Sequence, residues 1–174
     1  TLIVHGIIHL ASDISDLAED PEISKSLVAY HALMYAKEHA GLERARGSGL
    51  FNVQNTVSTD FVLYLGEVFR QEVYINEFYE YANAVEVDHF ENIVQGPDVD
   101  QTLAWRKVLM DSVITNDLGG ISAGDWFSAA TERINLLKQA EDTINEDLVH
   151  IIDDLEQETL NFLLMFSVID LAVV

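Results

Sequence analysis

The C-terminal third of the chain constrains the fold most, because its apolar residues recur at seven-residue spacing over an unusually long stretch. No proline follows Ala123, and one helical face carries Ala130, Ile134, Leu137, Ile144, Leu148, Ile151, Leu155 and Phe162, interrupted only by Glu141 and Glu158. A seven-residue repeat of this length predicts one long helix in a left-handed supercoil. Its partner is either another helix of the same chain or a second subunit.

The upstream sequence also predicts helices and no strands. Apolar residues at three- and four-residue steps, separated by glycine and proline breaks, place these helices at residues 2–17, 21–46, 61–94 and 98–116. The third of them either continues or bends near residue 85. The chain, residues 1–174, is therefore predicted to be one all-α domain, an antiparallel (up-down) four-helix bundle with long first and last helices.

The periodicity also predicts which residues face the interior of the bundle. On the helices at 61–94 and 98–116 we expect an inward face formed by Phe61, Leu65, Val68, Ile75, Tyr79, Trp105, Val108, Leu109 and Val113. Gly47-Ser48-Gly49 is expected to end the helix that begins at Pro21, because glycine readily adopts the left-handed conformation of a helix exit. Ser122, three residues before Asp125, is typical of a helix N-terminus.

The charge of the chain excludes several classes of function. Thirty acidic residues against nine Lys and Arg give a net charge of −21, and such a surface repels nucleic acids and anionic lipid head groups. Cysteine is absent, and no Ser/His/Asp order, phosphate-binding loop or dinucleotide-binding glycine pattern occurs. We therefore predict no enzymatic activity, no catalytic residues and no cofactor.

Metal and cofactor sites find little support elsewhere in the sequence. His5 and His9 lie four residues apart but have no acidic third ligand nearby, so we predict no metal site there. His39 directly follows Glu38, which is not the Glu-x-x-His spacing of di-iron helices. An aromatic-rich patch on the third helix indicates core packing or a dimer contact, and it comprises Tyr74, Phe78, Tyr79 and Tyr81.

A cluster of positive charge stands out in this acidic chain. The apolar positions Ile23, Leu27, Tyr30 and Met34 continue, at the same helical steps, into Lys37, Gly41 and Arg44, and Arg46 follows two residues later. Burying an unpaired cation costs several kcal/mol, so such an arginine needs an acidic partner or a ligand. Two interpretations remain open: an internal ion pair to Glu38, Glu43 or another helix, or a seat for a small anion beside Gly41.

Two segments of the chain resemble a known family. The run Lys37-Glu38-His39-Ala40-Gly41-Leu42-Glu43-Arg44-Ala45 resembles the "KE-x-A-G-x-ERA" segment of the nitrate/nitrite-sensing domains of bacterial chemoreceptors and related signalling proteins. Trp126-Phe127, followed by Thr131, Arg133-Ile134 and Leu137, is similar to a second segment of that family, "WF-x-x-x-T-x-R-I-x-x-L". An earlier family segment, "Q-x-ERG", is not found, so we expect the chain to correspond to the second half of the domain.

The resemblance implies a helical, usually dimeric sensor that binds nitrate or nitrite through arginines and relays helix motion to an output module. It assigns ligand binding to Arg44, and the cation cluster adds Lys37, Gly41 and Arg46 as candidates. The function expected is thus an extracytoplasmic (periplasmic) ligand-sensing domain that binds nitrate, nitrite or a similar small anion or carboxylate. A structural or dimerising helical module without a small-molecule ligand is the alternative.

The two ends of the chain indicate what kind of protein it belongs to. The chain begins at Thr1 without a methionine or a signal peptide, so we expect it to be part of a longer protein. The family resemblance implies that this protein is a membrane-anchored receptor. Phe162–Val174 is mostly apolar but shorter than the ~20 residues that a membrane span requires. It is either the end of a core helix or the approach to a span, and length alone does not decide between them.

Overall fold

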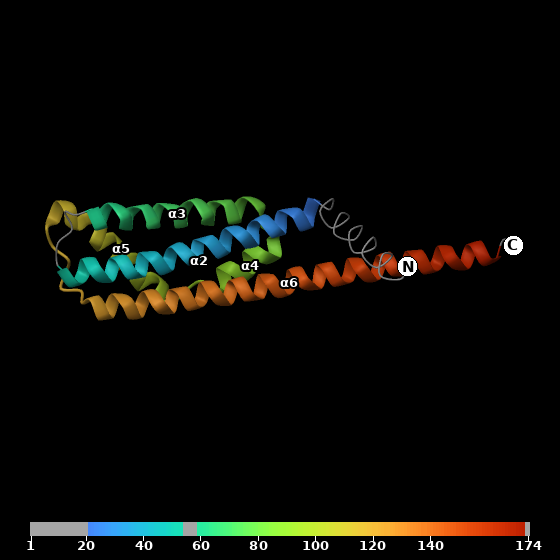
Figure 1. Ribbon diagram of the computed structural model, residues 1–174. Coiled ribbons are helices and arrows are strands. Elements are labelled where there is room, and N and C mark those ends of the chain that lie inside the picture. Colours follow the sequence, from blue (N-terminus) through green and yellow to red (C-terminus); the bar gives the residue numbers. More distant parts are fainter. Residues whose placement is uncertain (1–20, 54–58, 173–174) are drawn as a thin grey trace, which may run out of the picture.

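The computed structural model describes residues 21–53 and 59–172, and this part of the chain is all-helical, as predicted. Its elements are α2 (Pro21–Val53), α3 (Thr59–Tyr81), α4 (Ala84–Ile93), α5 (Pro97–Thr115) and α6 (Ala123–Ala172). Figure 1 shows α2, α3 and α6 running along the long axis, while α4 and α5 follow one another back along it. The C-terminal part of α6 extends well beyond the other helices.

Ile23 is buried as predicted, but beyond it the buried face of α2 lies one position away from the predicted one. Its core line includes Ala29, Leu33, Ala36, Ala40 and Glu43, whereas the predicted core residue Leu27 is 46% exposed. The prediction was wrong because it followed the large apolar side chains. Small residues form the contact instead, and they allow neighbouring helices to approach α2 closely.

The predicted end of α2 at Gly47-Ser48-Gly49 is also wrong, because the helix continues to Val53. Gly47 serves close packing rather than termination. A Cβ built on Gly47 would lie 2.5 Å from Nε1 of Trp126 on α6, which is closer than van der Waals contact permits. The Trp126 indole packs directly against the backbone of α2 at this position, so position 47 must be a glycine.

A capping box divides the predicted third helix into α3 and α4. The Asn83 side chain accepts hydrogen bonds from the backbone of Val85 and Glu86, and the Glu86 carboxylate accepts one from the backbone N–H of Asn83. This reciprocal pairing satisfies N–H groups that a helix start otherwise leaves without partners. The local chemistry of Asn83 thus overrides the apolar periodicity that favoured one continuous or bent helix.

The inward face of α5 is more polar than predicted. Leu109 is buried as expected, but Val113 is 47% exposed, while Thr102, Arg106 and Ser112 are buried. Periodicity of apolar residues could not find this face, because three of its five buried residues are polar. On α3, Phe61 and Val68 are buried as predicted, whereas Tyr79 is exposed.

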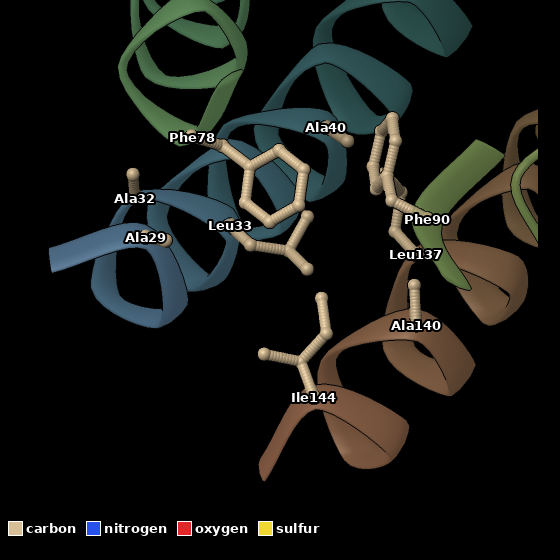
Figure 2. Packing of buried hydrophobic residues seen from close by; sticks show 9 residues of the cluster. All are labelled: Ala29, Ala32, Leu33, Ala40, Phe78, Phe90, Leu137, Ala140 and Ile144. Carbon is tan, nitrogen blue, oxygen red and sulfur yellow. The ribbon is translucent and has the colours of Figure 1, made fainter. Parts of the chain in front are cut away.

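Two apolar clusters form the core on either side of a polar layer. One joins α2, α3, α4 and α6, and Figure 2 shows its members: Ala29, Ala32, Leu33, Ala40, Phe78, Phe90, Leu137, Ala140 and Ile144. The other surrounds Trp126 near the start of α6 and includes Phe51, Tyr64 and Leu109. The start of α6 is fixed by Ser122, whose hydroxyl accepts the N–H of Asp125, as the sequence indicated.

Several predictions fall outside the described residues. These are the helix at 2–17, the histidines His5 and His9, and the apolar seam beyond Ile151 as far as its side chains are concerned. Within the described part of the chain, no helix combines the length and apolar character needed to cross a bilayer.

Candidate functional site

Two of the predicted site residues are held by acids on neighbouring helices. The ammonium of Lys37 lies 2.5 Å from the Glu141 carboxylate of α6, and the Nε of Arg46 lies 3.2 Å from the Glu67 carboxylate of α3. Glu141, which interrupts the apolar seam of α6, is thus buried opposite a cation of α2. Each of these pairs ties α2 to one neighbour and already satisfies the charge of its cation.

Arg44 differs from both of these cations. It is half-buried, and no carboxylate of the described residues lies within ion-pair distance of it. Its Nη1 donates to the Thr131 hydroxyl at 2.9 Å, and the guanidinium lies over the Phe127 ring, 4.6 Å from the centroid. The Nε of Arg44 is buried without a hydrogen-bond partner. This side chain therefore carries a charge without an acidic partner, and a donor without an acceptor, among residues 21–53 and 59–172.

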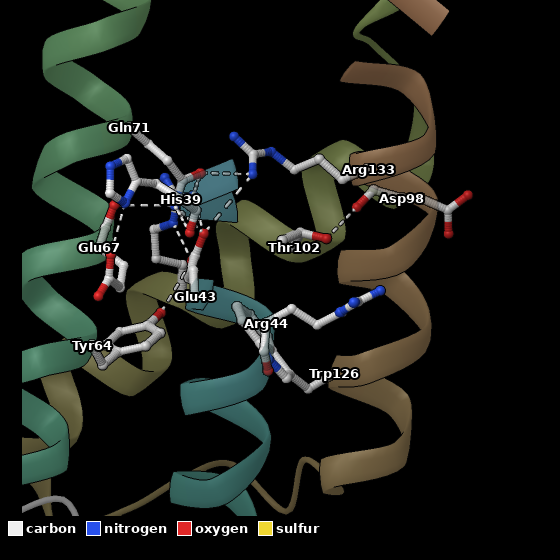
Figure 3. A network of polar contacts seen from close by, with 11 residues as sticks. His39, Glu43, Arg44, Tyr64, Glu67, Gln71, Asp98, Thr102, Trp126 and Arg133 are labelled. Carbon is white, nitrogen blue, oxygen red and sulfur yellow. Dashed lines mark hydrogen bonds and ion pairs between the residues drawn. The ribbon is translucent and has the colours of Figure 1, made fainter. Parts of the chain in front are cut away.

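Helix α6 fixes the orientation of Arg44. Thr131 donates its own proton to the Phe127 carbonyl at 2.7 Å, so its hydroxyl oxygen faces the guanidinium as an acceptor. The Trp126 indole donates to the backbone carbonyl of Arg44 at 3.0 Å. Figure 3 shows the Arg44 side chain pointing from α2 toward α6. A Cβ added to nearby Gly41 would meet no heavy atom within 4 Å, so space is open along this edge of α2.

A second polar centre lies deeper in the molecule, around Glu43. This carboxylate is only 1% exposed, and both of its oxygens bind the Arg106 guanidinium of α5 at 2.7 Å. It also accepts hydrogen bonds from the Gln71 amide at 2.7 Å and from the Tyr64 hydroxyl at 3.3 Å. A paired and fully hydrogen-bonded carboxylate of this kind is the form in which a charge can be buried.

Gln71 extends this centre to α6. Its amide oxygen accepts one hydrogen bond from Arg106 at 3.1 Å and one from Arg133 at 3.0 Å. Arg133 is 8% exposed and lies 3.9 Å from Glu43. Figure 3 shows the Arg133 side chain extending from α6 toward Gln71 of α3. The polar layer therefore joins α2, α3, α5 and α6 through a single amide and a single carboxylate.

The two buried arginines experience opposite environments. Burial lowers the pKa of Arg106, but the hydrogen bonds and charge of Glu43 outweigh this and raise it above its ordinary value. Burial and the neighbouring charge of Arg106 lower the pKa of Arg133 to about 10. Arg133 thus remains protonated near neutral pH, but it bears a cost that Glu43 does not fully offset. Burial and the Glu43 charge raise the pKa of Tyr64, which keeps its phenol neutral.

A third cluster binds α2 to α3 at Glu67. This carboxylate accepts hydrogen bonds from His39 at 2.8 Å, Arg46 at 3.2 Å and Arg70 at 3.3 Å. Burial raises the pKa of the Glu67 carboxyl, but the hydrogen bonds from His39 and Arg46 outweigh it and hold this pKa below its ordinary value. The cluster thus pairs the Nε of Arg46 with an acid of α3.

The sequence comparison decides the family. The family model described as nitrate and nitrite sensing matches residues 1–149, most of the chain. The chain belongs to the nitrate and nitrite sensing family. No curated protein and no solved structure matches it. The family membership confirms the resemblance found in the two sequence segments, and it fits a sensor rather than an enzyme.

Sequence reasoning did not predict that Arg106 and Arg133 belong to the buried polar layer. Arg106 lies at a core position of α5, seven residues after Val99, and this spacing was the signal that could have revealed it. Arg133 stands in the second family-like segment, between the seam residues Ala130 and Leu137, but no role was assigned to it. The described residues contain no group of three metal-ligating side chains.

Proposed function

We propose that this domain senses nitrate, nitrite or a similar small anion through Arg44, as the ligand-binding part of a signal-transduction receptor. The observation that carries the proposal is the uncompensated guanidinium of Arg44 in a member of the nitrate and nitrite sensing family. A guanidinium presents parallel donors that match two oxygens of a planar oxyanion. The sequence made Arg44 the anchor, and its lack of an acidic partner supports that role.

The surroundings of Arg44 fit a small ligand. The open edge beside Gly41 offers space one helical turn before the guanidinium, and Thr131 adds a hydroxyl. Lys37 and Arg46 contribute to the local potential, although each already binds an acid. A purely structural helical module, which is the alternative, would contain these two ion pairs as well. The two hypotheses differ at Arg44, because only the sensor gives this residue a ligand to bind.

Anion binding at Arg44 would act on the contact between α2 and α6. The side chains that orient Arg44, namely Trp126, Phe127 and Thr131, all belong to the first turns of α6. A ligand that draws the guanidinium away from Thr131 would favour a different packing of α6 against α2. Because α6 is one continuous helix of 50 residues, a shift at its start would reach its far end without a hinge.

The rest of the proposal follows the family. We infer an extracytoplasmic location in a membrane-anchored parent protein, a homodimeric receptor of the chemoreceptor type, and α4 and α5 acting together as one interrupted member of a four-helix up-down bundle. In a dimer, the exposed apolar side chains of α2 and α3 would supply contact area, and they include Leu27, Val28, Val62, Phe69 and Val73. Analytical ultracentrifugation of the chain tests the dimer directly.

Calorimetric titration of the chain with nitrate, nitrite, chloride and sulfate tests the ligand. We expect nitrate or nitrite to bind, and Arg44→Gln to weaken that binding at least about tenfold, because charged hydrogen bonds contribute roughly 1.5–3 kcal/mol. Gly41→Leu should also weaken it, since the larger side chain fills the open edge. Lys107→Gln, which removes an exposed cation of α5, is the matched control and should bind like the unaltered chain.

The structural alternative predicts a different result. If Arg44→Gln and Gly41→Leu fold normally and bind nitrate with unchanged affinity, Arg44 is not the anchor. If the unaltered chain binds none of the four anions, the domain is a structural helical module. Circular dichroism of each variant establishes that the fold is intact.

A further inference from the structure

The buried layer around Glu43 contains more positive than negative charge. Glu43 contributes one negative charge, Arg106 and Arg133 contribute one positive charge each, and Gln71 and Tyr64 are neutral. The side chains of this layer thus carry a net charge of +1 inside a molecule whose net charge is −21. Because an uncompensated buried charge is costly, this excess calls for a counterion.

Hydrogen bonding shows the same imbalance. Each oxygen of Glu43 accepts two hydrogen bonds, and the Gln71 oxygen accepts two more. Within the described part of the chain, Arg133 uses one N–H group in a hydrogen bond, to Gln71, although a guanidinium has five such groups. The acceptors of the layer are therefore saturated, while donors of Arg133 remain. An additional acceptor with a negative charge would correct both deficits.

A pocket lies where such an acceptor could bind. It has a volume of about 340 Å³ and is lined by Gln71, Glu72, Ile75, Asn76, Arg106 and Arg133. Both buried arginines line it, and Asn76 adds a residue with a neutral amide. Arg44 does not line this pocket, so the pocket is separate from the site proposed above.

Glu72 sets the limits on the ligand. It is an exposed residue of α3 at the edge of the pocket, and its charge acts on Arg106 without a direct ion pair. An anion that enters the pocket is repelled by the Glu72 carboxylate. This repulsion is strongest for a doubly charged anion. The net charge of +1 in the buried layer is likewise neutralised by an anion with a single negative charge. The chemistry favours one small monovalent anion and disfavours sulfate.

We propose that this pocket is a second anion site, in which Arg133 and Arg106 hold one small monovalent anion such as chloride or nitrate. The site would connect α3, α5 and α6 through the ligand and so stabilise the packing of α6 in the middle of the molecule. It goes beyond the sensing site at Arg44 and does not depend on it. Occupancy is expected in Arg44→Gln as well.

The test measures the thermal stability of the chain at constant ionic strength, exchanging sodium gluconate for sodium chloride, nitrate or sulfate. We expect chloride to raise the melting temperature in a saturable manner, in the unaltered chain and in Arg44→Gln alike. Nitrate should do so in Arg44→Gln as well, where binding at Arg44 is already weakened. Sulfate should give no saturable effect. Arg133→Gln should lose the response to chloride, and the double variant Arg44→Gln with Arg133→Gln should lose the response to nitrate, because the change at Arg133 removes both the excess charge and the free donors.

Glu72→Gln tests the site without altering the buried layer, which matters if Arg133→Gln does not fold. Removing the charge at the edge of the pocket should tighten chloride and nitrate binding by roughly threefold to tenfold, as expected for one partly screened charge nearby. Glu80→Gln, at another exposed position of α3, is the matched control and should leave the affinity unchanged. The proposal is overturned if Glu72→Gln and Glu80→Gln behave alike, or if a folded Arg133→Gln keeps the response to chloride.

Discussion

Gly47 and Trp126 connect the packing of the domain to the orientation of Arg44. The indole lies against the glycine, stacks near Phe51, and donates its N–H to the Arg44 carbonyl. It is fully buried, so it has little freedom to move away from a larger residue at position 47. A single missing Cβ therefore allows α6 to approach α2 closely enough for Thr131 to contact the Arg44 guanidinium.

Gly47→Ala is accordingly expected to destabilise the chain by about 2 kcal/mol, because overpacking a buried contact typically costs 1–3 kcal/mol. Gly49→Ala is the control, since a Cβ there meets no heavy atom within 4 Å. In a helix interior that change should stabilise by about 0.5–1 kcal/mol. Urea unfolding followed by tryptophan fluorescence measures both. Equal effects at the two positions would show that the contact with Trp126 is not what requires glycine.

At the scale of elements, the sequence predicted helices better than their contacts. The starts at Pro21, Pro97 and Ala123 follow from proline and capping chemistry, which act locally. The faces of α2 and α5 could not be derived in the same way. Their buried positions include Ala40 and Glu43 on α2 and Thr102 on α5, which the spacing of large apolar residues did not mark as core. Which polar residue is buried depends on a partner from another helix, and a single sequence does not show that partner.

The contact between α2 and α3 should respond to acid through Glu67. The pKa of this carboxyl is lower in the folded chain than its ordinary value of 4.5, so the folded state favours the ionised form. Its contribution to stability is then complete above about pH 5 and is lost as the pH falls through the folded pKa. In Glu67→Gln this contribution is absent at every pH.

The difference in unfolding free energy between the unaltered chain and Glu67→Gln should therefore be largest near pH 7 and shrink toward pH 3.5. Urea unfolding at a series of pH values measures it. Glu38→Gln, at an exposed position of α2, serves as the comparison and should show a small difference at all pH values. A Glu67→Gln difference that stays constant across this range would mean that the hydrogen bonds from His39 and Arg46 do not favour the ionised carboxylate.

At the scale of the whole molecule, the candidate site could be located from the sequence only in part. The cation cluster and the family-like segments led to Arg44, which is the one half-buried cation without an acidic partner among the described residues. Lys37 and Arg46 come from the same cluster but bind Glu141 and Glu67, and those acids lie about a hundred and about twenty residues away. Sequence proximity groups these cations, whereas the fold decides which of them has an acidic partner.

The overall charge of the molecule leads to a last prediction, about salt. With a net charge of −21, the folded chain repels itself more than the expanded unfolded chain does, and ions screen this repulsion over about 10 Å at 0.1 M. Sodium gluconate, whose bulky anion suits neither proposed site, should therefore raise the melting temperature steadily from 10 to 300 mM. Scanning calorimetry measures the slope.

A variant with less charge separates screening from specific binding. Glu80→Lys with Glu146→Lys changes two exposed acids, adds two charges at each position, and brings the net charge from −21 to −17. Its melting temperature should rise less steeply with gluconate, because less repulsion remains to be screened, while its saturable response to chloride should persist. An unchanged gluconate slope would contradict self-repulsion as the cause. The two responses arise from different features: the surface carboxylates set the first, and the buried guanidiniums set the second.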